Sequence, residues 1–321
     1  MTHRFTEDEL IERLFAPLAG PAGLGLRDDA ALLPAGEESV ATMDALVAGV
    51  HFFADDPPGA IAKKALRVNL SDLAAKGAEP MGFLLALALP ETWTNAWLEA
   101  FAQGLGEDAA RFGCPLIGGD TVKTLGPLTI AITALGRTKG RFVPRAGAKV
   151  GDGVFVSGTI GDAALGLRLR KDPAFAARLS PSSRDFLLER YLLPRPRLEL
   201  APLLRQGASA AMDISDGLLG DLGKLARASK VSAWVVLADI PFSEAAREAL
   251  ALAPDILETL LCGGDDYEIL ACGEAALLGD GPGGRGHFRR IGEITAGLAA
   301  PRLVDSQGKQ IEFKTLSFSH F

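Results

Sequence analysis

Short apolar runs that adjoin turns of glycine and aspartate recur along the whole chain. Three clear cases lie at residues 114–120, 212–217 and 261–271. Apolar runs of this length predict buried strands, and glycine and aspartate favour the tight turns beside them. Segments with helical spacing of apolar residues lie at residues 6–18, 58–76, 94–112 and 218–228. Because strands and helices mix in both halves, the sequence predicts an α/β or α+β fold.

The chain is long enough for two domains. Its 321 residues correspond to about two units of roughly 150 residues each. Residues 136–153 are rich in Gly, Arg and Lys, so we expect the domain boundary there. The sequence therefore predicts an N-terminal domain at residues 1–140 and a C-terminal α/β domain at residues 141–321, with no short-period repeat.

Charge and composition argue against several classes of protein. The chain has a net charge of −7 and no basic stretch that could neutralise a run of nucleic-acid phosphates. A nucleotide could still bind through metal ions that acidic residues hold. The longest apolar stretch, residues 81–89, is too short to span a bilayer, and the N-terminus has no apolar signal core. Cys114, Cys262 and Cys272 have no zinc spacing. We expect a cytoplasmic protein with free buried thiols and no membrane or nucleic-acid partner.

Carboxylates are concentrated at the glycine-containing turns. The sites are Asp28 with Asp29, Asp44, Asp120, Asp213 with Asp216, and Asp265 with Asp266, and Asp72 joins them from an expected helix. So many carboxylates repel one another unless a cation holds them together, and Mg²⁺ prefers oxygen ligands and shares substrate phosphates. Taken singly, turn formation is the better explanation for each aspartate, and an ion pair with Lys76 for Asp72. Taken together, the aspartates indicate metal and phosphate binding.

Several common motifs are missing from the sequence. It contains no GxxxxGK[ST] phosphate loop and no GxSxG nucleophile motif. Residues 154–166 resemble a strand–glycine–helix turn but lack the GxGxxG spacing of dinucleotide-binding folds. His51 lies between apolar neighbours, and it is either a turn histidine with a satisfied hydrogen bond or a contact to a phosphate or polar substrate group.

Six segments, in order along the chain, resemble the thiamine-monophosphate kinase family. They contain Asp28 and Asp29; Thr42, Asp44, His51 and Phe52; Val68, Asn69, Asp72 and Pro80; Gly118, Gly119, Asp120 and Thr121; Asp213, Ser215, Asp216 and Gly217; and Gly263, Gly264, Asp266, Tyr267 and Glu268. Residues 318–321 resemble the family's C-terminal ending. Because the segments span residues 28–268, their combination is far more specific than any one motif.

The resemblance implies a two-domain fold like that of aminoimidazole ribonucleotide synthetase. In that fold, strands of two N-terminal domains form a barrel across a homodimer, and a C-terminal α/β domain covers the nucleotide. The implied reaction phosphorylates thiamine monophosphate to thiamine diphosphate with ATP as co-substrate and several Mg²⁺ ions. The N-terminal domain would then bind ATP and magnesium and form the dimer.

Family positions carry over to this chain residue by residue. The implied magnesium ligands are Asp28, Thr42, Asp44, Asp72, Asp120, Asp213 and Asp216, together with the backbone carbonyl of Met43. Of these, Asp44, Asp72, Asp120 and Asp213 are the implied catalytic residues. The implied ATP contacts are Gly119, Asp120, Arg145 and Ser215, and the implied thiamine contacts are His51, Asp265 and Phe318.

Three positions depart from the family pattern without removing a metal ligand. Arg27 stands where Gly is usual, Asp265 where Glu is usual, and Phe318 where Trp is frequent. Asp265 is one methylene shorter than Glu, so its carboxylate reaches less far toward a substrate, whereas Phe318 still permits stacking. The nucleophile would be an already ionised phosphate oxygen of the substrate, so direct in-line transfer needs no strong general base.

Related families fit the sequence less well. A selenophosphate synthetase would be expected to have a reactive Cys or selenocysteine in its N-terminal glycine-rich loop, and the hydrogenase-maturation relative to end in Cys. This chain has no such loop cysteine and ends in Phe321. A synthetase acting on an imidazole ribonucleotide precursor is the remaining catalytic alternative. A non-catalytic relative would be expected to have lost several aspartate ligands, and this chain retains the main ones.

Overall fold

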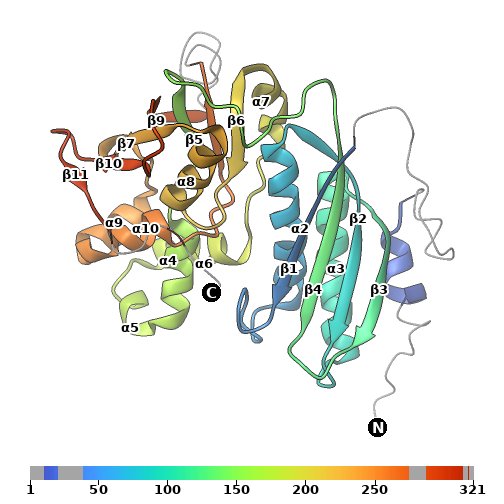
Figure 1. Ribbon diagram of the computed structural model, residues 1–321. Coiled ribbons are helices and arrows are strands. Elements are labelled where there is room, and N and C mark those ends of the chain that lie inside the picture. The colour runs from blue at the N-terminus through green and yellow to red at the C-terminus, as the bar shows by residue number, and fades with distance from the viewer. Residues whose placement is uncertain (1–10, 21–38, 275–286, 314–316, 318–321) are drawn as a thin grey trace. The chain divides into compact units, whose positions relative to one another are not determined.

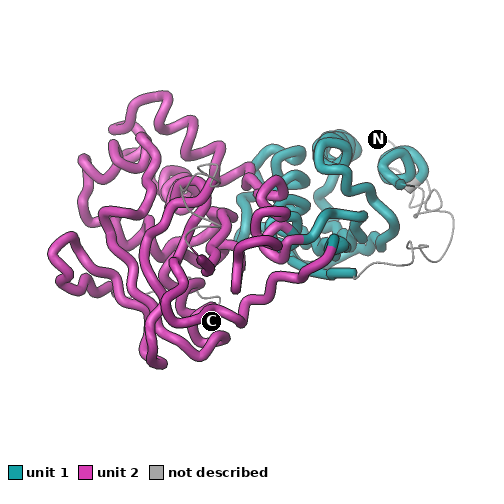
Figure 2. The backbone as a smooth tube through the Cα atoms, turned by 90° about the horizontal axis from the view of Figure 1, so that it is seen from above, with its two compact units in different colours: residues 1–73, 78–139 teal, residues 74–77, 140–321 magenta. Residues whose placement is uncertain are grey.

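A computed structural model describes residues 11–20, 39–274, 287–313 and 317 of the chain. The chain divides into two compact units, the first formed by residues 1–73 and 78–139 and the second by residues 74–77 and 140–321 (Figure 2). Residues 74–77 thus belong to the second unit, although the chain before and after them belongs to the first. After Lys139 the rest of the chain belongs to the second unit.

The first unit is a four-stranded sheet with two long helices on one face (Figure 1). In sheet order, the strands are β1 (Ser39–Val47), β4 (Thr129–Thr138), β2 (Ala78–Leu89) and β3 (Leu116–Lys123). The helices are α2 (Pro58–Ala75) and α3 (Asn95–Phe112). Every second residue of β4 is buried, which is the pattern of a sheet that packs helices on one face only. The opposite face is called the open face below.

The two helices are joined by a close backbone approach and a buried ion pair. A Cβ at Gly104 would lie 2.5 Å from the Cα of Gly59, so α3 can approach α2 this closely only because residue 104 has no side chain. Arg67 on α2 donates from Nε to Asp108 Oδ2 on α3 at 2.5 Å, and both side chains are buried. The helix α3 begins at its cap Thr94 and ends at Gly113 in the left-handed conformation.

The second unit is built on a seven-stranded mixed sheet. In sheet order, the strands are β11 (Gln310–Ile311), β10 (Arg302–Val304), β7 (Ser232–Val236), β9 (Phe288–Thr295), β5 (Gly153–Ser157), β8 (Ile269–Gly273) and β6 (Ala208–Asp213). The longer helices are α4 (Asp162–Lys171), α6 (Pro181–Leu192), α7 (Ala201–Gly207), α8 (Leu218–Ser229), α9 (Glu244–Leu252) and α10 (Leu257–Cys262). Five of the six strand pairings are antiparallel, and β10 pairs with β7 in the parallel direction.

The second unit has cores on both faces of its sheet. Val154 and Val156 of β5 belong to the larger core, and the residue between them, Phe155, belongs to the smaller one. Ala74 and Ala75, the last residues of α2, pack in that smaller core. Because both faces are covered, β5 is a continuous apolar run instead of an alternating one.

Most expected helices and strands are present with shifted ends. The structure places helices at Pro58–Ala75, Asn95–Phe112 and Leu218–Ser229, close to the predicted segments. The expected helix at residues 6–18 is described only from Ile11, where short helical turns cover Ile11–Phe15 and Ala16–Leu18. In the part of the chain that the structure describes, no helix is both long and apolar enough to cross a membrane.

Candidate functional site

The N-terminal part of the site begins with two residues of β1 that face α2. Thr42 Oγ1 donates a hydrogen bond to Asp72 Oδ2 at 2.5 Å. The backbone N–H of Asp44 donates to Asn69 Oδ1 at 3.1 Å, and Asn69 Nδ2 donates to the carbonyl of Ala65 at 3.0 Å. Residues 65, 69 and 72 share one face of α2 because they are three and four positions apart. The structure therefore brings Thr42, Asp44 and Asp72 together.

The two carboxylates of this group are electrostatically coupled. Burial, and secondly the negative charge of Asp72, raise the pKa of Asp44 from 3.8 to about 6. A shift in this direction means that ionised Asp44 is unfavourable without a nearby cation. Hydroxyl and carboxylate oxygens are the donors that Mg²⁺ prefers, so the residues present fit this metal. Within the described residues, however, no group of three or more His, Cys, Asp or Glu side chains could hold a metal ion. Asp44 and Asp72 alone therefore do not form such a group.

The pKa of Asp44 predicts a pH-dependent stability of the metal-free protein. Because this pKa is raised from 3.8 to about 6, protonated Asp44 favours the folded state, fully below pH 3.8, and this contribution is lost as the pH rises to about 6. We expect a loss of roughly 2 kcal/mol in the free energy of unfolding, after allowance for partial solvent exposure. Urea unfolding between pH 4 and 7 measures it. Asp44→Asn should abolish the loss, and an equal loss in this variant would contradict the assignment.

His51 is held in the turn that follows β1. The backbone N–H of Val47 donates to His51 Nδ1 at 3.0 Å, and Lys64 Nζ donates to the carbonyl of His51 at 3.2 Å. Because Nδ1 accepts a hydrogen bond, a neutral ring has its proton on Nε2. His51 is therefore a turn histidine whose Nδ1 has a hydrogen-bond partner, which is the first of the two alternatives. The second alternative, a contact to substrate, is compatible with the same ring orientation if it is made through Nε2.

The Gly119–Asp120 pair lies on β3, at the opposite edge of the sheet from Asp44. A Cβ at Gly119 would overlap the carbonyl oxygen of Leu85, so only glycine fits there. Asp120 is exposed and pairs in register with Ala86 of β2. Three strand spacings of about 4.8 Å separate β1 from β3, which gives roughly 14 Å between the edges. Within one chain, the structure does not bring Asp120 to Asp44.

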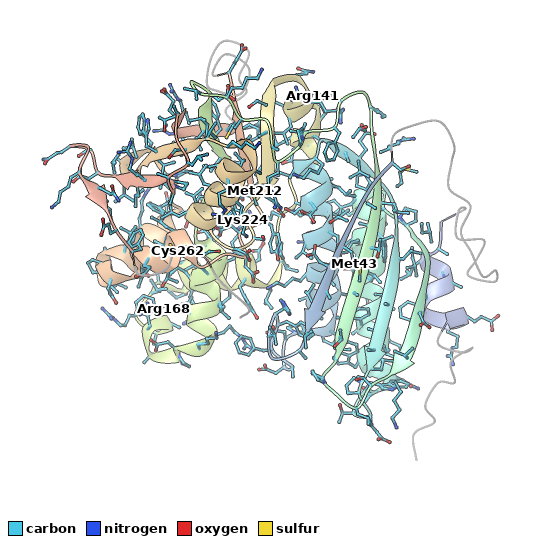
Figure 3. All side chains as sticks on the ribbon, viewed as in Figure 1. Met43, Arg141, Arg168, Met212, Lys224 and Cys262 are labelled. Atoms are coloured by element: carbon cyan, nitrogen blue, oxygen red, sulfur yellow. The ribbon has the colours of Figure 1, made fainter. Side chains whose placement is uncertain are left out.

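Met43 lies between Thr42 and Asp44 and points to the other side of the sheet. Its side chain is 63% exposed on the open face, since successive residues of a strand point to opposite faces. Figure 3 shows this side chain on the sheet of the first unit. A contribution of Met43 to a metal site through its carbonyl oxygen, as predicted, remains compatible with this placement.

In the second unit, two turns with acidic residues are joined by backbone hydrogen bonds. The N–H of Asp265 donates to the carbonyl of Ser215 at 2.8 Å, and the N–H of Tyr267 donates to the carbonyl of Ile214 at 2.8 Å. Asp265 and Tyr267 have φ values of 64° and 52°, the left-handed region that side chains rarely adopt. A Cβ at Gly264 would overlap the Ser215 carbonyl oxygen. The structure therefore brings Ser215 and Asp265 together, with Asp213 and Asp216 on the same turn as Ser215.

Buried charges support the second of these turns. Glu268 is fully buried and accepts hydrogen bonds from Arg190 Nη2 at 2.9 Å, Arg197 Nε at 2.7 Å and Ser157 Oγ at 2.6 Å. Asp266 Oδ2 accepts from the backbone N–H of Gly161 at 2.7 Å. Burial raises the pKa of Asp266 well above its ordinary value. The sequence analysis missed Arg190 and Arg197, because arginines in helices and loops carry no signal of a distant partner.

Lys224 is a second functional candidate that the sequence analysis missed. It lies on α8 (Figure 3), and its ammonium donates to Asp216 Oδ2 and, at 2.7 Å, to Asp221 Oδ1. Burial alone would lower the pKa of Lys224, but the hydrogen bonds to both carboxylates outweigh this and leave the pKa raised. A predicted magnesium ligand, Asp216, therefore already has a cationic partner from the same chain. The Asp-x-x-Lys spacing at 221–224 was the only available signal.

Of the other predicted site residues, the structure describes Arg145 but not Asp28 or Phe318. Arg145 is exposed in the connection between β4 and β5, and its carbonyl oxygen accepts a hydrogen bond from Ser229 at 3.4 Å. Asp28, Arg27 and Phe318 lie outside the described residues. The structure therefore does not test the expectations for these three.

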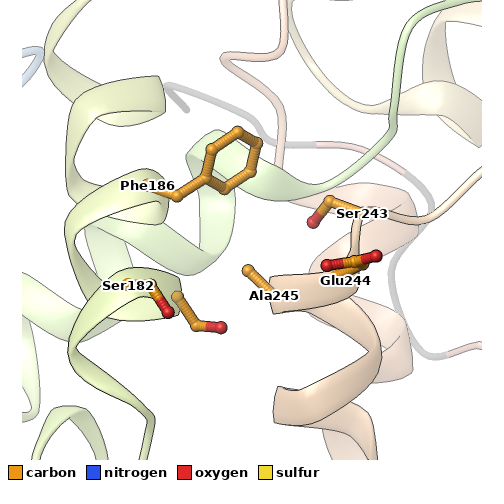
Figure 4. A pocket seen from close by; sticks show the side chains of 6 residues that line it. Ser182, Phe186, Ser243, Glu244 and Ala245 are labelled. Carbon is orange, nitrogen blue, oxygen red and sulfur yellow. The ribbon is translucent and has the colours of Figure 1, made fainter.

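Two pockets in the described residues are lined by residues other than the predicted site residues. One, of about 330 Å³, lies between the N-terminal ends of α6 and α9 and is lined by Ser182, Ser183, Phe186, Ser243, Glu244 and Ala245 (Figure 4). The other, of about 460 Å³, is in the first unit and is mainly apolar, with Phe52, Trp93 and Trp97 in its wall. Neither pocket is lined by a predicted metal ligand or a predicted ATP or thiamine contact.

Comparison with protein families identifies both halves of the chain. Residues 27–138 match the N-terminal domain model of AIR synthase related proteins, and residues 149–300 match the C-terminal domain model of the same proteins. The mixed α/β, two-domain fold of this superfamily is therefore confirmed.

Individual relatives narrow the comparison. A curated thiamine-monophosphate kinase of Caulobacter vibrioides is 46% identical over 273 residues, which cover 83% of this chain and 76% of that protein. The crystal structure of thiamine-monophosphate kinase from Stenotrophomonas maltophilia K279a is 40% identical, with a TM-score of 0.77 over 89% of this chain and 91% of that chain. A structure described as AaThiL complexed with AMPPCP and TMP is 31% identical, with a TM-score of 0.79 over 100% of both chains.

Proposed function

The chain belongs to the thiamine-monophosphate kinase family, and from this membership we propose that it transfers the γ-phosphoryl group of ATP to thiamine monophosphate. The chain is a kinase. Its substrates follow from the relative that was solved with the ATP analogue AMPPCP and with TMP. The observation in this chain that supports the proposal most directly is the raised pKa of Asp44 beside Asp72, a pair of carboxylates suited to a metal that carries phosphates.

Magnesium would be held first by the N-terminal carboxylates. We assign Asp44, Asp72 and Thr42 to this role, with the carbonyl of Met43, and Asp28, Asp120, Asp213 and Asp216 follow from the family resemblance. When bound, Mg²⁺ neutralises phosphate oxygens and thus lowers the repulsion between two anionic substrates. The protein's contribution is positional. The hydrogen bonds Thr42–Asp72 and Asn69–Asp44 hold β1 against α2 and orient the two carboxylates.

The proposed transfer is direct and in line. The substrate phosphate is ionised near neutral pH, so its oxygen can attack the γ-phosphorus of ATP without a protein base, and ADP is the leaving group. The protein must then hold the substrate phosphate in line with the γ-phosphoryl group of ATP and prevent other orientations of the two groups. We assign Gly119, Arg145 and Ser215 to ATP, since their backbone or cationic groups suit phosphate or nucleotide binding. His51, Asp265 and Phe318 are assigned to the thiamine moiety. The left-handed backbone at Asp265 supports this role, because such strain is typical of functional turns.

The open face of the first unit supports a homodimer. Its exposed residues include Met43 at 63%, Val122 at 49% and Leu84 at 37%. Met43 pairs in register with Thr133 of β4, and Thr133 pairs with Leu84 of β2, so these side chains form one row across the sheet. A contiguous, mostly apolar face exposed on a single chain is typical of a surface that another protein covers. We propose that two copies cover each other's open face and close their sheets into a barrel.

A dimer would also complete the metal site. Asp44 and Asp120 lie on the two edge strands of the sheet, roughly 14 Å apart by strand spacing, whereas Mg²⁺ needs ligands at about 2.1 Å. Asp120 shares a cross-strand row with Ala45, through Ala86 and Ala131, and therefore points to the open face, which a second copy would cover. We therefore propose that the Asp120 that joins Asp44 and Asp72 comes from a second copy of the chain.

The cysteines support the predicted cytoplasmic location. Cys114, Cys262 and Cys272 are free and buried. Burial raises the pKa of Cys114 and of Cys262 to about 12 and also raises that of Cys272. Thiols in this state are protonated and unreactive at neutral pH. We propose that the protein works in the reducing cytoplasm, where such thiols stay free.

The test of this function is an assay of the purified chain with ATP and Mg²⁺. It offers thiamine monophosphate, free thiamine or no acceptor, and separates the thiamine species by chromatography. We expect thiamine diphosphate from the monophosphate alone, and no product after chelation of the metal. Terminal ³²P label from ATP should pass to the product without labelling the protein. Product from free thiamine only, or no product from folded protein that binds ATP, would overturn the proposal.

A further inference from the structure

A lysine is built into the turn that carries the second unit's acidic residues. Asp221 on α8 is fully buried, and its Oδ2 accepts the backbone N–H groups of Ser215 at 3.0 Å and Asp216 at 2.9 Å. Its Oδ1 accepts from Lys224 Nζ at 2.7 Å. The same ammonium also donates to Asp216 Oδ2. Asp221 therefore fixes the turn with one oxygen and the lysine with the other.

This arrangement differs from an ordinary surface ion pair. Both oxygens of Asp221 have hydrogen-bond partners, and its side chain is 0% exposed, whereas Asp216 is 32% exposed. Lys224 is 29% exposed and thus mostly enclosed. A long side chain held by a buried carboxylate has few alternative positions, so the ammonium is fixed at Asp216. Of these two carboxylates, only that of Asp216 faces solvent, where a dissolved cation could reach it.

We propose that Lys224 is an internal cation that competes with the divalent metal for Asp216. The inference rests on the proposed function, because that function makes Asp216 a metal ligand. Lys224 and a metal ion would both bind the Asp216 carboxylate, and two cations on one carboxylate repel each other. A metal must therefore displace the ammonium or bind weakly beside it. The phosphates of a nucleotide would give the displaced ammonium a new partner, so metal binding at Asp216 should depend on nucleotide.

The direct test is Mn²⁺ binding to the full chain without nucleotide, followed through the electron paramagnetic resonance signal of free Mn²⁺. Mn²⁺ serves as the probe because it takes the same oxygen ligands as Mg²⁺. We expect Lys224→Met to bind one additional Mn²⁺ or to bind Mn²⁺ at least about ten-fold more tightly than the unchanged chain. The double variant Lys224→Met/Asp216→Asn should lose this gain. Equal binding by Lys224→Met and the unchanged chain would overturn the inference, as would a gain that survives in the double variant.

A matched control separates competition at one carboxylate from a change in net charge. Arg227 is exposed and lies one turn further along α8. Arg227→Met removes the same charge from the same helix, and we expect less than about a three-fold change in Mn²⁺ affinity, since exposed charges are strongly screened. A gain equal to that of Lys224→Met would contradict the inference. Lys224→Arg, which keeps the charge, should bind Mn²⁺ like the unchanged chain, and thermal melts establish that each variant is folded.

The outcomes for Lys224 and for the proposed function are distinguishable. If the unchanged chain makes thiamine diphosphate but Lys224→Met gains no Mn²⁺ binding, the inference fails and the function stands. If the chain makes no thiamine diphosphate but Lys224→Met gains a site that depends on Asp216, the proposed reaction fails and the competition stands. If neither form binds Mn²⁺, the inference is overturned, because removal of the lysine has then uncovered no metal site.

Discussion

Asp44→Asn is expected to reduce the formation of thiamine diphosphate by at least about 10³-fold while the protein stays folded. The amide has the size of the carboxylate but no negative charge, so it is a poor ligand for Mg²⁺. The fold should tolerate the change, because the raised pKa shows that burial already disfavours ionised Asp44. Asp72→Asn should have a similar effect on turnover. Steady-state rates at saturating Mg²⁺ and ATP, with thermal melts, measure both effects.

Glu99→Gln provides the matched control for these two variants. Glu99 is exposed on α3 in the same unit, and its neutralisation changes the net charge of the chain by the same amount. We expect its rate to stay within about two-fold of the unchanged chain, as for most exposed substitutions. Near-normal activity of both Asp44→Asn and Asp72→Asn would contradict the proposed role of these carboxylates. A loss in Glu99→Gln equal to theirs would show that net charge, and not metal binding, is responsible.

Mixed dimers of Asp44→Asn and Asp120→Asn should recover activity that neither variant has alone. If each site takes Asp44 from one copy and Asp120 from the other, a mixed dimer has one site with both substitutions and one with neither. It should then show about half the activity of the unchanged dimer. Co-expression with two different affinity tags and two-step purification gives such dimers, and the thiamine diphosphate assay measures them.

The mixed dimer of Asp44→Asn and Asp72→Asn is the control for this experiment. Asp72 is held beside β1 of its own chain through Thr42, so each site of this dimer lacks one carboxylate. We expect it to remain inactive. An inactive mixed dimer of Asp44→Asn and Asp120→Asn would contradict the proposal that each site takes residues from both copies. The same conclusion would follow if sedimentation measurements showed the fully active protein to be a monomer.

Helical periodicity made part of the N-terminal site predictable. Asn69 and Asp72 are three residues apart, and the expected helix at residues 58–76 places them on one face whatever else the chain does. The helical relation depends only on local backbone geometry, so the sequence determines it, and the family resemblance supplied the reaction. Asp44, by contrast, was expected at a glycine-containing turn, whereas the structure places it within β1, where strand alternation directs Thr42 and Asp44 to one side and Met43 to the other.

Other parts of the site depend on which distant segments lie side by side. Asp44 and Asp120 are both implied magnesium ligands, yet the order β1-β4-β2-β3 places them on opposite edges of one sheet. The Arg190–Glu268 pair carried no sequence signal, since the two residues are 78 positions apart and only folding brings them into reach. Lys224 was indicated only by its spacing from Asp221 on the same helix, which does not reveal its contact with Asp216.

The sequence by itself therefore determined the main helices, the acidic turns of the second unit and the family of this protein, whereas Asp44 and Asp120, also expected at turns, lie within β1 and β3. Only the tertiary structure decided that Lys224 neutralises Asp216, that the turns at Ser215 and Asp265 are joined, and that one chain leaves Asp120 away from Asp44. The physical reason is the distance along the chain over which each kind of interaction acts. Turn and helix preferences act over a few residues, whereas strand order and buried ion pairs result from packing the whole chain.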